Sequence, residues 1–374
     1  MNILIFSWRG PGHPHAGGAE KSTHEHAKGW VKAGYSVTLF TSDYAGCKPE
    51  EVIDGVRIIR NGTQILGVHL KAFLWFISNN QDKFDLVVDQ FHGIPFFTPL
   101  YVRVKKLAFI HELTKEVWRL NALPKPINLI PAVLGTILEP YVFKFFYRNI
   151  PFMTGSDSTK EELINWGIPR NNISVVHHGL EQPPFKKIPP KERKKTLIFL
   201  GALAKDKGIE EAIKVFSLVN ARGGKFKFWI AGKGEKNYTS YLKTMAEKNG
   251  LKQNIVFWGY VSENQKYQLL AKSHLLVNTS FREGWGLVVL EAASVGTPTV
   301  GFDVPGLRDS IIDGKTGVLS SRDPNEASSK ILGILKDNQR YNLLRKNGIE
   351  WAKKFTWKKS STLSLKLIEK IVKI

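Results

Sequence analysis

The amino-acid sequence predicts an α/β protein with two doubly wound domains, each organised around a parallel sheet. Short apolar runs alternate with helical stretches in two separate series, the pattern of parallel strands joined by crossover helices. The chain has 374 residues, which is too long for one ordinary core and suits two domains of similar size. A basic, proline-rich segment separates the two series and favours an extended connector. We therefore expect a first domain at residues 1–181, a linker at 182–195 and a second domain at 196–356.

The elements of each series follow from apolar runs and the residues that interrupt them. Residues 1–6 predict a buried strand, because the run is short, apolar and followed by glycine and proline. Gly34 ends the helix expected at residues 19–32. Further strands of the first series are expected at 37–40, 57–59, 86–88, 108–110 and 174–176. The second series predicts strands at 197–200, 227–230, 255–257, 275–277 and 299–300, with helices at 209–220, 239–248 and 287–293.

The composition indicates a globular protein of a reducing compartment. The hydrophobic content of 43% is ordinary for such a protein. Cys47 is the single cysteine, so the chain forms no internal disulfide, which fits the cytosol. No run is long and apolar enough for a spanning helix, and the N-terminus reads as a first strand rather than a signal peptide. We expect a cytoplasmic protein.

The formal net charge of +21 indicates anionic partners. Nucleic acid, an anionic membrane surface and phosphorylated substrates all remain open on charge alone. A lysine-rich, solvated surface without any partner is the plainer alternative. Nucleic acid is the least expected of the three, because the chain carries no helix-turn-helix, zinc or RNA-recognition motif.

The most informative segment is residues 281–291, which read FREGWGLVVLE. Gly284 and Gly286 let the backbone turn tightly before the expected helix, whose free N–H groups and positive dipole end favour a phosphate. Glu283 and Glu291 flank this position and suit hydrogen bonds from hydroxyl groups on either side, so the pattern predicts a nucleotide-sugar site. An ordinary strand–loop–helix, with Glu283 as an N-terminal charge, is the alternative.

The Glu-x7-Glu spacing around Gly284-Trp285-Gly286-Leu287 is similar to the signature of glycosyltransferase family 4. The resemblance implies retaining, metal-independent enzymes with a GT-B fold, in which two Rossmann-like domains face each other across a cleft. It extends over about residues 1–317, and the helix expected at 357–374 resembles the family helix that returns to the first domain. It implies that Glu283 is catalytic and that Gly284, Trp285, Gly286, Leu287 and Glu291 bind the donor.

Two features of the first domain resemble the same family. Gly17 and Gly18 lie between the first strand and the first helix, where close backbone approach to a phosphate or sugar is favoured, although an ordinary tight turn explains a glycine pair equally well. His111 ends an expected strand, and a lone histidine there is more often structural. The resemblance implies that His111 is catalytic, holding the sugar partly through its backbone carbonyl rather than acting as a general base.

The phosphate loop of the second domain is expected at residues 201–208. Lys207 follows a strand and precedes a helix, from which it could reach a diphosphate, while a solvated lysine is the alternative. The family usually has an arginine where this chain has Ala202, and Lys205 and Arg282 are the candidates to replace it. We count Lys207 as catalytic and Lys205 as donor-binding.

Gly259, Tyr260 and Val261 follow another strand and resemble the family's base-binding loop. The resemblance implies that backbone groups of these residues read the nucleobase, so their side chains do not identify it.

Residues 100–148 mix apolar and aromatic side chains with lysine and arginine. This mixture suits an interfacial helix on anionic lipid. A helix buried in the domain core, with a basic face toward solvent, accounts for it equally well.

We therefore interpret the chain as a retaining, hexosyltransferase-type glycosyltransferase that uses a nucleotide-diphosphate sugar. The expected acceptor is a membrane-associated glycan or lipid-linked molecule of cell-envelope polysaccharide synthesis, reached by peripheral binding to the inner face of the cell membrane. No cofactor and no metal are expected, since the chain has one cysteine and scattered histidines. The alternatives are a catalytically weak nucleotide-sugar-binding protein and a basic nucleic-acid-binding protein.

Overall fold

The computed structural model describes residues 1–79, 82–91, 93–120 and 129–373. The chain forms two compact units, which are described separately. Unit 1 comprises Met1–Gly179 and Thr356–Ile374, and unit 2 comprises Leu180–Phe355. Residues 182–195 thus belong to unit 2, and the last helix, α12 (Trp357–Lys373), belongs to unit 1.

Unit 1 contains an eight-stranded sheet in the order β3-β4-β2-β1-β5-β6-β7-β8. All neighbouring strands are parallel except β3 and β4, which form an antiparallel hairpin. Asp54 and Gly55 make the hairpin turn with φ angles of 51° and 81°, which fits the Asp-Gly preference of tight hairpin turns. The strands are β1 (Asn2–Ser7), β2 (Ser36–Thr41), β3 (Glu50–Ile53), β4 (Val56–Arg60), β5 (Leu86–Phe91), β6 (Lys105–Ile110), β7 (Phe152–Thr154) and β8 (Ile173–Val175).

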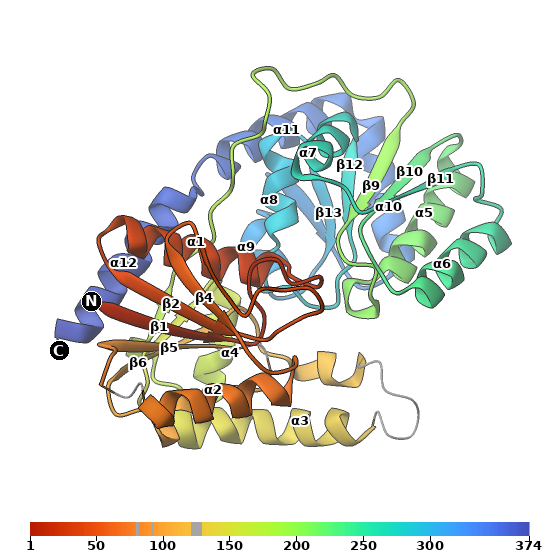
Figure 1. The fold of residues 1–374 in the computed structure, drawn as a ribbon. Helices are drawn as coiled ribbons and strands as arrows, with labels where there is room; N and C mark the ends of the chain where they lie inside the picture. The colour runs from red at the N-terminus through yellow and green to blue at the C-terminus, as the bar shows by residue number, and fades with distance from the viewer. Residues whose placement is uncertain (80–81, 92, 121–128, 374) are drawn as a thin grey trace. The chain divides into compact units, whose positions relative to one another are not determined.

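Helices cover both faces of the unit 1 sheet, with α1 and α12 on one face and α2 and α3 on the other (Figure 1). Side chains of β1 therefore enter two cores in alternation: Ile3 and Ile5 pack toward α1 and α12, while Leu4 and Phe6 pack toward α2. This two-sided burial explains the unbroken apolar run at the N-terminus. The helices are α1 (Gly18–Lys32), α2 (Leu66–Asn79), α3 (Leu129–Val142) with the π-turn η3 (Phe143–Tyr147), and α4 (Asp157–Asn165), and short 3₁₀ segments are η1 (Thr98–Leu100), η2 (Lys115–Leu120) and η4 (Arg170–Asn172).

Unit 2 contains a six-stranded parallel sheet in the order β11-β10-β9-β12-β13-β14. The strand order reverses between β9 and β12, which creates a topological switch point at their carboxyl ends. The strands are β9 (Thr196–Leu200), β10 (Lys227–Ala231), β11 (Ile255–Gly259), β12 (Leu275–Asn278), β13 (Thr299–Phe302) and β14 (Gly317–Ser320). The helices are α5 (Ile209–Gly223), α6 (Lys236–Lys248), α7 (Glu263–Lys272), α8 (Leu287–Ser294), α9 (Leu307–Ser310), α10 (Pro324–Lys336) and α11 (Asn338–Ala352), with the 3₁₀ turn η5 (Lys205–Lys207).

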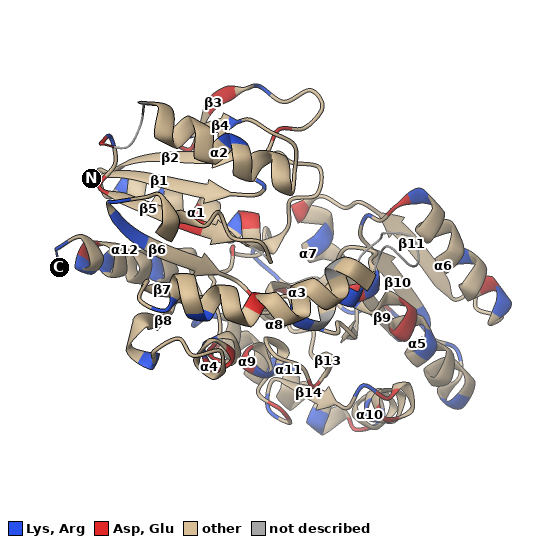
Figure 2. Ribbon diagram, turned by 90° about the horizontal axis from the view of Figure 1, so that it is seen from below, with Lys and Arg blue, Asp and Glu red and all other residues tan. Residues whose placement is uncertain are grey.

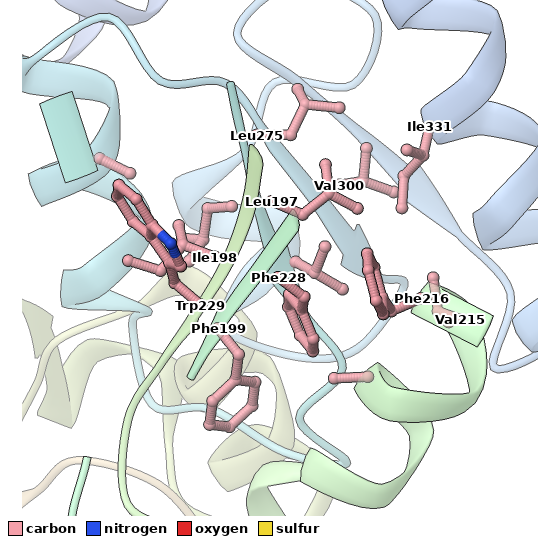
Figure 3. Packing of buried hydrophobic residues seen from close by; sticks show 14 of the residues in the cluster. Leu197, Ile198, Phe199, Val215, Phe216, Phe228, Trp229, Leu275, Val300 and Ile331 are labelled. Carbon is pink, nitrogen blue, oxygen red and sulfur yellow. The ribbon is translucent and has the colours of Figure 1, made fainter. Parts of the chain in front are cut away.

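The unit 2 core holds these strands in register. Phe216 of α5 stacks on Phe228 of β10 with ring centroids 4.9 Å apart, and Leu197 and Val300 bring β9 and β13 into the same cluster (Figure 3). Helix α5 packs against α10 on this core, and α8 packs against α11. The predicted fold class, α/β with two Rossmann-like parallel sheets, is confirmed.

Candidate functional site

The loops that follow β9 and β12 are joined to each other at the switch point of unit 2. The Phe281 N–H donates to the Asp206 carbonyl at 2.9 Å, and the Thr279 hydroxyl donates to the Gly208 carbonyl at 2.7 Å. Residues 201–208 and 279–286 therefore form one connected edge. In open α/β sheets this is the position at which ligands bind.

Lys207 and Glu283, both predicted to be catalytic, meet on this edge. The Lys207 ammonium lies 3.2 Å from Glu283 Oε1, and the Ser280 hydroxyl donates to the same oxygen at 2.8 Å. The side chains are 26% and 17% exposed, so both are partly shielded but still open to a ligand. The pair presents a cation for a phosphate beside a carboxylate for a hydroxyl group.

Two glycines allow the backbone contacts that hold this pair. Gly208 has a φ angle of 66°, and a Cβ there would lie 1.9 Å from the Thr279 carbonyl oxygen. Gly306 has a φ angle of 80°, and its Cβ would lie 2.0 Å from the Glu283 carbonyl oxygen. A side chain at Gly208 would push apart the loops that carry Lys207 and Glu283, and one at Gly306 would displace the backbone of Glu283.

The remaining residues of the Gly-Trp-Gly-Leu segment build the start of α8. Gly286 caps the helix with a φ angle of 76°, and Leu287 is its first residue. Gly284 is partly exposed. Trp285 is 3% exposed, and its ring packs against Phe355 at 5.2 Å, so only its backbone is available to a donor.

Glu291 is paired with a lysine that the sequence analysis did not consider. Lys266 Nζ of α7 lies 2.7 Å from Glu291 Oε1 and 2.8 Å from Glu263 Oε2. Glu291 and Lys266 are both only 8% exposed. The carboxylate that was expected to receive ribose hydroxyls therefore also compensates a nearly buried cation.

The expected base-binding loop follows β11. Gly259 has a φ angle of 65°, and its carbonyl accepts a 2.8 Å hydrogen bond from the Gly232 N–H. Val261 is partly buried against the unit 2 core, whereas Tyr260 is 70% exposed. The ammonium of Lys233 lies 4.3 Å above the Tyr260 ring. Sequence reasoning missed Lys233, although Gly-Lys-Gly directly after a strand was an available signal.

Lys205 and Arg282, the candidates to replace the arginine that is absent at position 202, differ in exposure to solvent. Ala202 is exposed, and so is Lys205 in η5. Arg282 is only 4% exposed. Of the two candidates from the sequence, Lys205 is thus the accessible one.

In unit 1, His111 lies at the carboxyl end of β6 within a buried polar chain. Its Nδ1 is 3.2 Å from His178 Nε2, its Nε2 is 3.4 Å from the Thr23 hydroxyl, and His178 Nδ1 is 2.9 Å from the Ser22 hydroxyl. Burial lowers the pKa of His178 to about 3, so this ring is neutral at pH 7. The His111 carbonyl accepts from the Thr159 hydroxyl at 3.3 Å.

Gly17 and Gly18 lie at the start of α1, beside a buried carboxylate. The Gly17 N–H donates to Glu20 Oε2 at 2.6 Å, and Arg9 Nε donates to Glu20 Oε1 at 2.9 Å. Glu20 is 4% exposed. The Gly17 N–H is therefore already used by the protein, and Arg9 and Glu20 together hold the β1–α1 loop.

Helices α2 and α3 present large apolar side chains to solvent, so the helix at residues 129–142 is not buried on all sides in the domain core. Along α3, the exposed fractions of Ile130, Val133, Leu134 and Ile137 lie between 51% and 59%. The other exposed apolar residues of this face are Leu66, Leu70, Leu74 and Ile77 of α2 and Leu129, Leu138, Tyr141, Phe145 and Phe146 of α3 and η3. We name these thirteen residues the α2–α3 face. No described helix combines the length and apolar character needed to cross a membrane.

Among residues 1–79, 82–91, 93–120 and 129–373, no three His, Cys, Asp or Glu side chains are grouped in a way that could hold a metal ion.

Comparison with known proteins identifies two matching family models and similar structures. The model described as Glycosyltransferase Family 4 matches residues 16–182, and the model described as Glycosyl transferases group 1 matches residues 181–351. An uncharacterized glycosyltransferase of Methanocaldococcus jannaschii is 23% identical over 363 residues, which cover 90% of each chain. Sucrose-phosphate synthase from Thermosynechococcus elongatus has a TM-score of 0.80 at 17% identity and covers 99% of this chain and 98% of its own. Anabaena HepE in complex with UDP-glucose has a TM-score of 0.74 at 17% identity, covering 99% of this chain and 100% of its own.

Proposed function

Because the chain belongs to glycosyltransferase family 4 and is a glycosyltransferase of GT-B fold, we propose that unit 2 binds its nucleotide-sugar donor at the Lys207–Glu283 pair. The observation that carries this proposal is the position of the pair. It lies at the topological switch point, on loops joined by two hydrogen bonds and close in sequence to the start of α8. The Lys207 ammonium contacts the diphosphate, and Glu283 accepts a hydrogen bond from a sugar hydroxyl.

The reaction that we propose proceeds with retention at the anomeric carbon. The bond from that carbon to the diphosphate oxygen breaks, and a bond to the acceptor oxygen forms on the same face, while the acceptor proton passes to the leaving diphosphate. The departing group gains negative charge, so the main contributions of the protein are positioning and cationic stabilisation by Lys207. His111 contributes its backbone carbonyl to sugar binding in unit 1, because both of its ring nitrogens already have protein partners.

A donor panel tests this proposal. Purified protein is incubated with UDP-, GDP- and ADP-sugars, and release of the free nucleoside diphosphate is measured with and without added acceptors. We expect one donor to be turned over, and we expect the product to keep the anomeric configuration of the donor by NMR. Tight binding of a donor without turnover would identify a nucleotide-sugar-binding protein instead, and binding of none would reject the proposal.

The acceptor that we propose is held at a membrane, and the support comes from the α2–α3 face. A water-soluble protein loses stabilisation when large apolar side chains remain in water, and extended apolar patches mark binding surfaces. In α3 the exposed positions recur along one side of the helix, as in helices that lie in a membrane interface.

The charges around the α2–α3 face favour an anionic bilayer over a protein partner. Helix α2 contains no acidic residue, and the single acid of α3, Glu139, is buried and accepts hydrogen bonds from Thr114, Lys115 and Trp118. Figure 2 accordingly shows both helices as mostly uncharged ribbon. Within α2, α3 and η3 the exposed charged side chains are basic, namely Lys71 and Lys144, and the exposed Arg148 directly follows η3. A second copy of the chain would bring the same net charge of +21 to the contact.

Vesicle sedimentation tests the membrane proposal. We expect the protein to sediment with vesicles that contain phosphatidylglycerol at low salt, less at high salt, and weakly with phosphatidylcholine alone. Failure to sediment with anionic vesicles at low salt would reject it. Concentration-dependent dimerisation without vesicle binding would instead assign the face to a second copy.

A further inference from the structure

We propose that Lys233 provides the second cation for the donor diphosphate, in place of the charge that Ala202 lacks. This inference rests on the proposed function, and it concerns how this chain completes a site that its sequence leaves one cation short. The diphosphate of a nucleotide-sugar carries two negative charges. Lys207 brings one positive charge but is paired with Glu283 at 3.2 Å, so these two side chains alone have no net charge.

The loop after β10 brings Lys233 next to Ala202. The Leu203 N–H donates to the Lys233 carbonyl at 2.7 Å, and Leu203 forms a parallel bridge with Gly234. A Cβ at Gly232 would lie 1.7 Å from the Gly201 carbonyl oxygen, so the two backbones are in direct contact. Lys233 therefore starts from the strand-end loop that directly neighbours the loop of Ala202 and Lys207.

The Lys233 ammonium is exposed and available to an anion. It lies 4.3 Å from the centroid of the Tyr260 ring, and within the described part of the chain it forms no ion pair with a carboxylate. A cation–π contact with an exposed tyrosine is weaker than a charge-assisted hydrogen bond to a phosphate oxygen. A bound diphosphate would thus draw Lys233 from the Tyr260 ring at little cost.

Lys205 is the competing candidate for the second cation. It is exposed, and the described residues likewise offer it no carboxylate partner, but it lies in η5 on the loop of Lys207 itself. Arg282 is excluded as an equally accessible cation because it is 4% exposed. The two lysines have the same charge and similar exposure, so their methionine variants differ only in position.

Calorimetric titration separates these assignments. The nucleoside diphosphate, monophosphate and nucleoside of the preferred donor base are titrated into the unaltered protein and into Lys233→Met, Lys205→Met, Ala202→Arg and the double variant Ala202→Arg/Lys233→Met. We expect Lys233→Met to weaken binding of the nucleoside diphosphate by about tenfold or more, because one charge-assisted contact is lost. Binding of the nucleoside should change little. Lys205→Met should lose less affinity for the diphosphate than Lys233→Met does. The double variant Ala202→Arg/Lys233→Met should recover most of the affinity that Lys233→Met loses, because it returns a guanidinium to the adjacent loop.

The outcomes distinguish this inference from the proposed function. If the unaltered protein binds no nucleoside diphosphate, the donor site itself is wrong. If it binds and Lys233→Met binds equally well, only the role of Lys233 is overturned. A loss confined to Lys205→Met would transfer the role to Lys205, and an equal loss for diphosphate and nucleoside would assign Lys233 to the base through Tyr260. Circular dichroism of each variant confirms that the fold is retained.

Discussion

The Lys207 ammonium and the Glu283 carboxylate, 76 residues apart in the chain, lie 3.2 Å from each other on joined loops of unit 2. Each side chain therefore sets the environment of the other. Glu283 orients Lys207 before a donor arrives, and a diphosphate must share or displace this contact. A mutation of either residue consequently changes both the charge and the geometry of the proposed donor site.

We predict that Lys207→Ala and Glu283→Ala each reduce sugar transfer by about a hundredfold or more, because preorganised charge on a leaving group is a large catalytic contribution. The double variant should lose less than the product of the two single effects, since the residues act as a pair. Steady-state kinetics with the preferred donor measures both quantities.

The matched control for this pair is Lys214→Ala on α5, which removes an exposed lysine paired with Glu211 at 3.1 Å. Its transfer rate should remain within about twofold, because exposed pairs contribute little. Unchanged turnover in both Lys207→Ala and Glu283→Ala, with an intact circular dichroism spectrum, would show that the donor lies elsewhere.

We predict that Glu291→Ala weakens both nucleotide binding and folding. The lost hydrogen bonds to a ribose correspond to roughly 1.5–3 kcal/mol of binding free energy. Removing the carboxylate also leaves the nearly buried Lys266 with the more exposed Glu263 as its partner, and breaking a buried pair destabilises a protein. The double variant Glu291→Ala/Lys266→Met removes that uncompensated cation. It should recover stability in thermal unfolding without recovering nucleotide affinity; recovery of both would make Glu291 purely structural.

The sequence predicted the fold because strand signals in a doubly wound protein are local. The runs at 197–200 and 227–230 became β9 and β10, and the helix expected at 287–293 became α8, since continuous apolar runs are buried on both sheet faces. The strand expected at 57–59 became β4, but its hairpin partner β3 and the three-residue β7 were missed, because both are short. It left α3 undecided, because a helix that is apolar on most sides does not reveal which side faces solvent.

The candidate site was predictable only as far as each loop could be assigned separately. The sequence indicated that Lys207 and Glu283 both follow strands, and the strand ends of a parallel sheet share one edge. The direct contact between the two side chains depends on Gly208 and Gly306, where other backbone segments pass too close for a side chain. The pairing of Glu291 with Lys266 and of His111 with His178 joins residues on different elements, so no local pattern announces it. Lys233 was overlooked because a lysine between two glycines reads as an ordinary turn.

We predict that unit 1 loses stability as the pH falls below about 6.5. Burial lowers the pKa of both His26 and His178 to about 3, so the unfolded chain binds more protons than the folded one between these values. The free energy of unfolding should then decrease with falling pH by up to about 1.4 kcal/mol per pH unit for each histidine, with the full contribution present above pH 7. Urea unfolding followed by tryptophan fluorescence between pH 5 and 8 measures this slope.

The variant His26→Leu should unfold with a shallower pH slope, because leucine cannot take up the proton. His15→Leu is the control, since His15 is exposed, and it should keep the original slope. A midpoint that does not move between pH 7 and pH 5 would contradict the assignment of neutral, buried histidines to unit 1.

The last prediction concerns which side chains of the α2–α3 face enter a membrane. Trp118 is a poor probe, because its indole donates to Glu139 at 3.0 Å and lies directly against Gly135, so its removal would disturb the packing of α3. Leu134→Gln and Ile137→Gln change only side chains that are 51% and 53% exposed. Each should weaken binding to anionic vesicles by about tenfold or more, since burying such a side chain contributes roughly 1.5–3 kcal/mol.

The control for these apolar variants is Leu343→Gln, which alters a leucine of equal exposure, 54%, on α11 of unit 2. It should leave vesicle binding unchanged. Lys144→Glu in η3 should weaken vesicle binding, and most strongly at low salt. Each cation near an anionic surface contributes about 1 kcal/mol, and salt screens this attraction. Its control, Lys248→Glu on α6, should leave vesicle binding unchanged. If all five variants bind vesicles equally, the α2–α3 face does not contact lipid, and if Leu343→Gln alone weakens binding, the contact lies on unit 2.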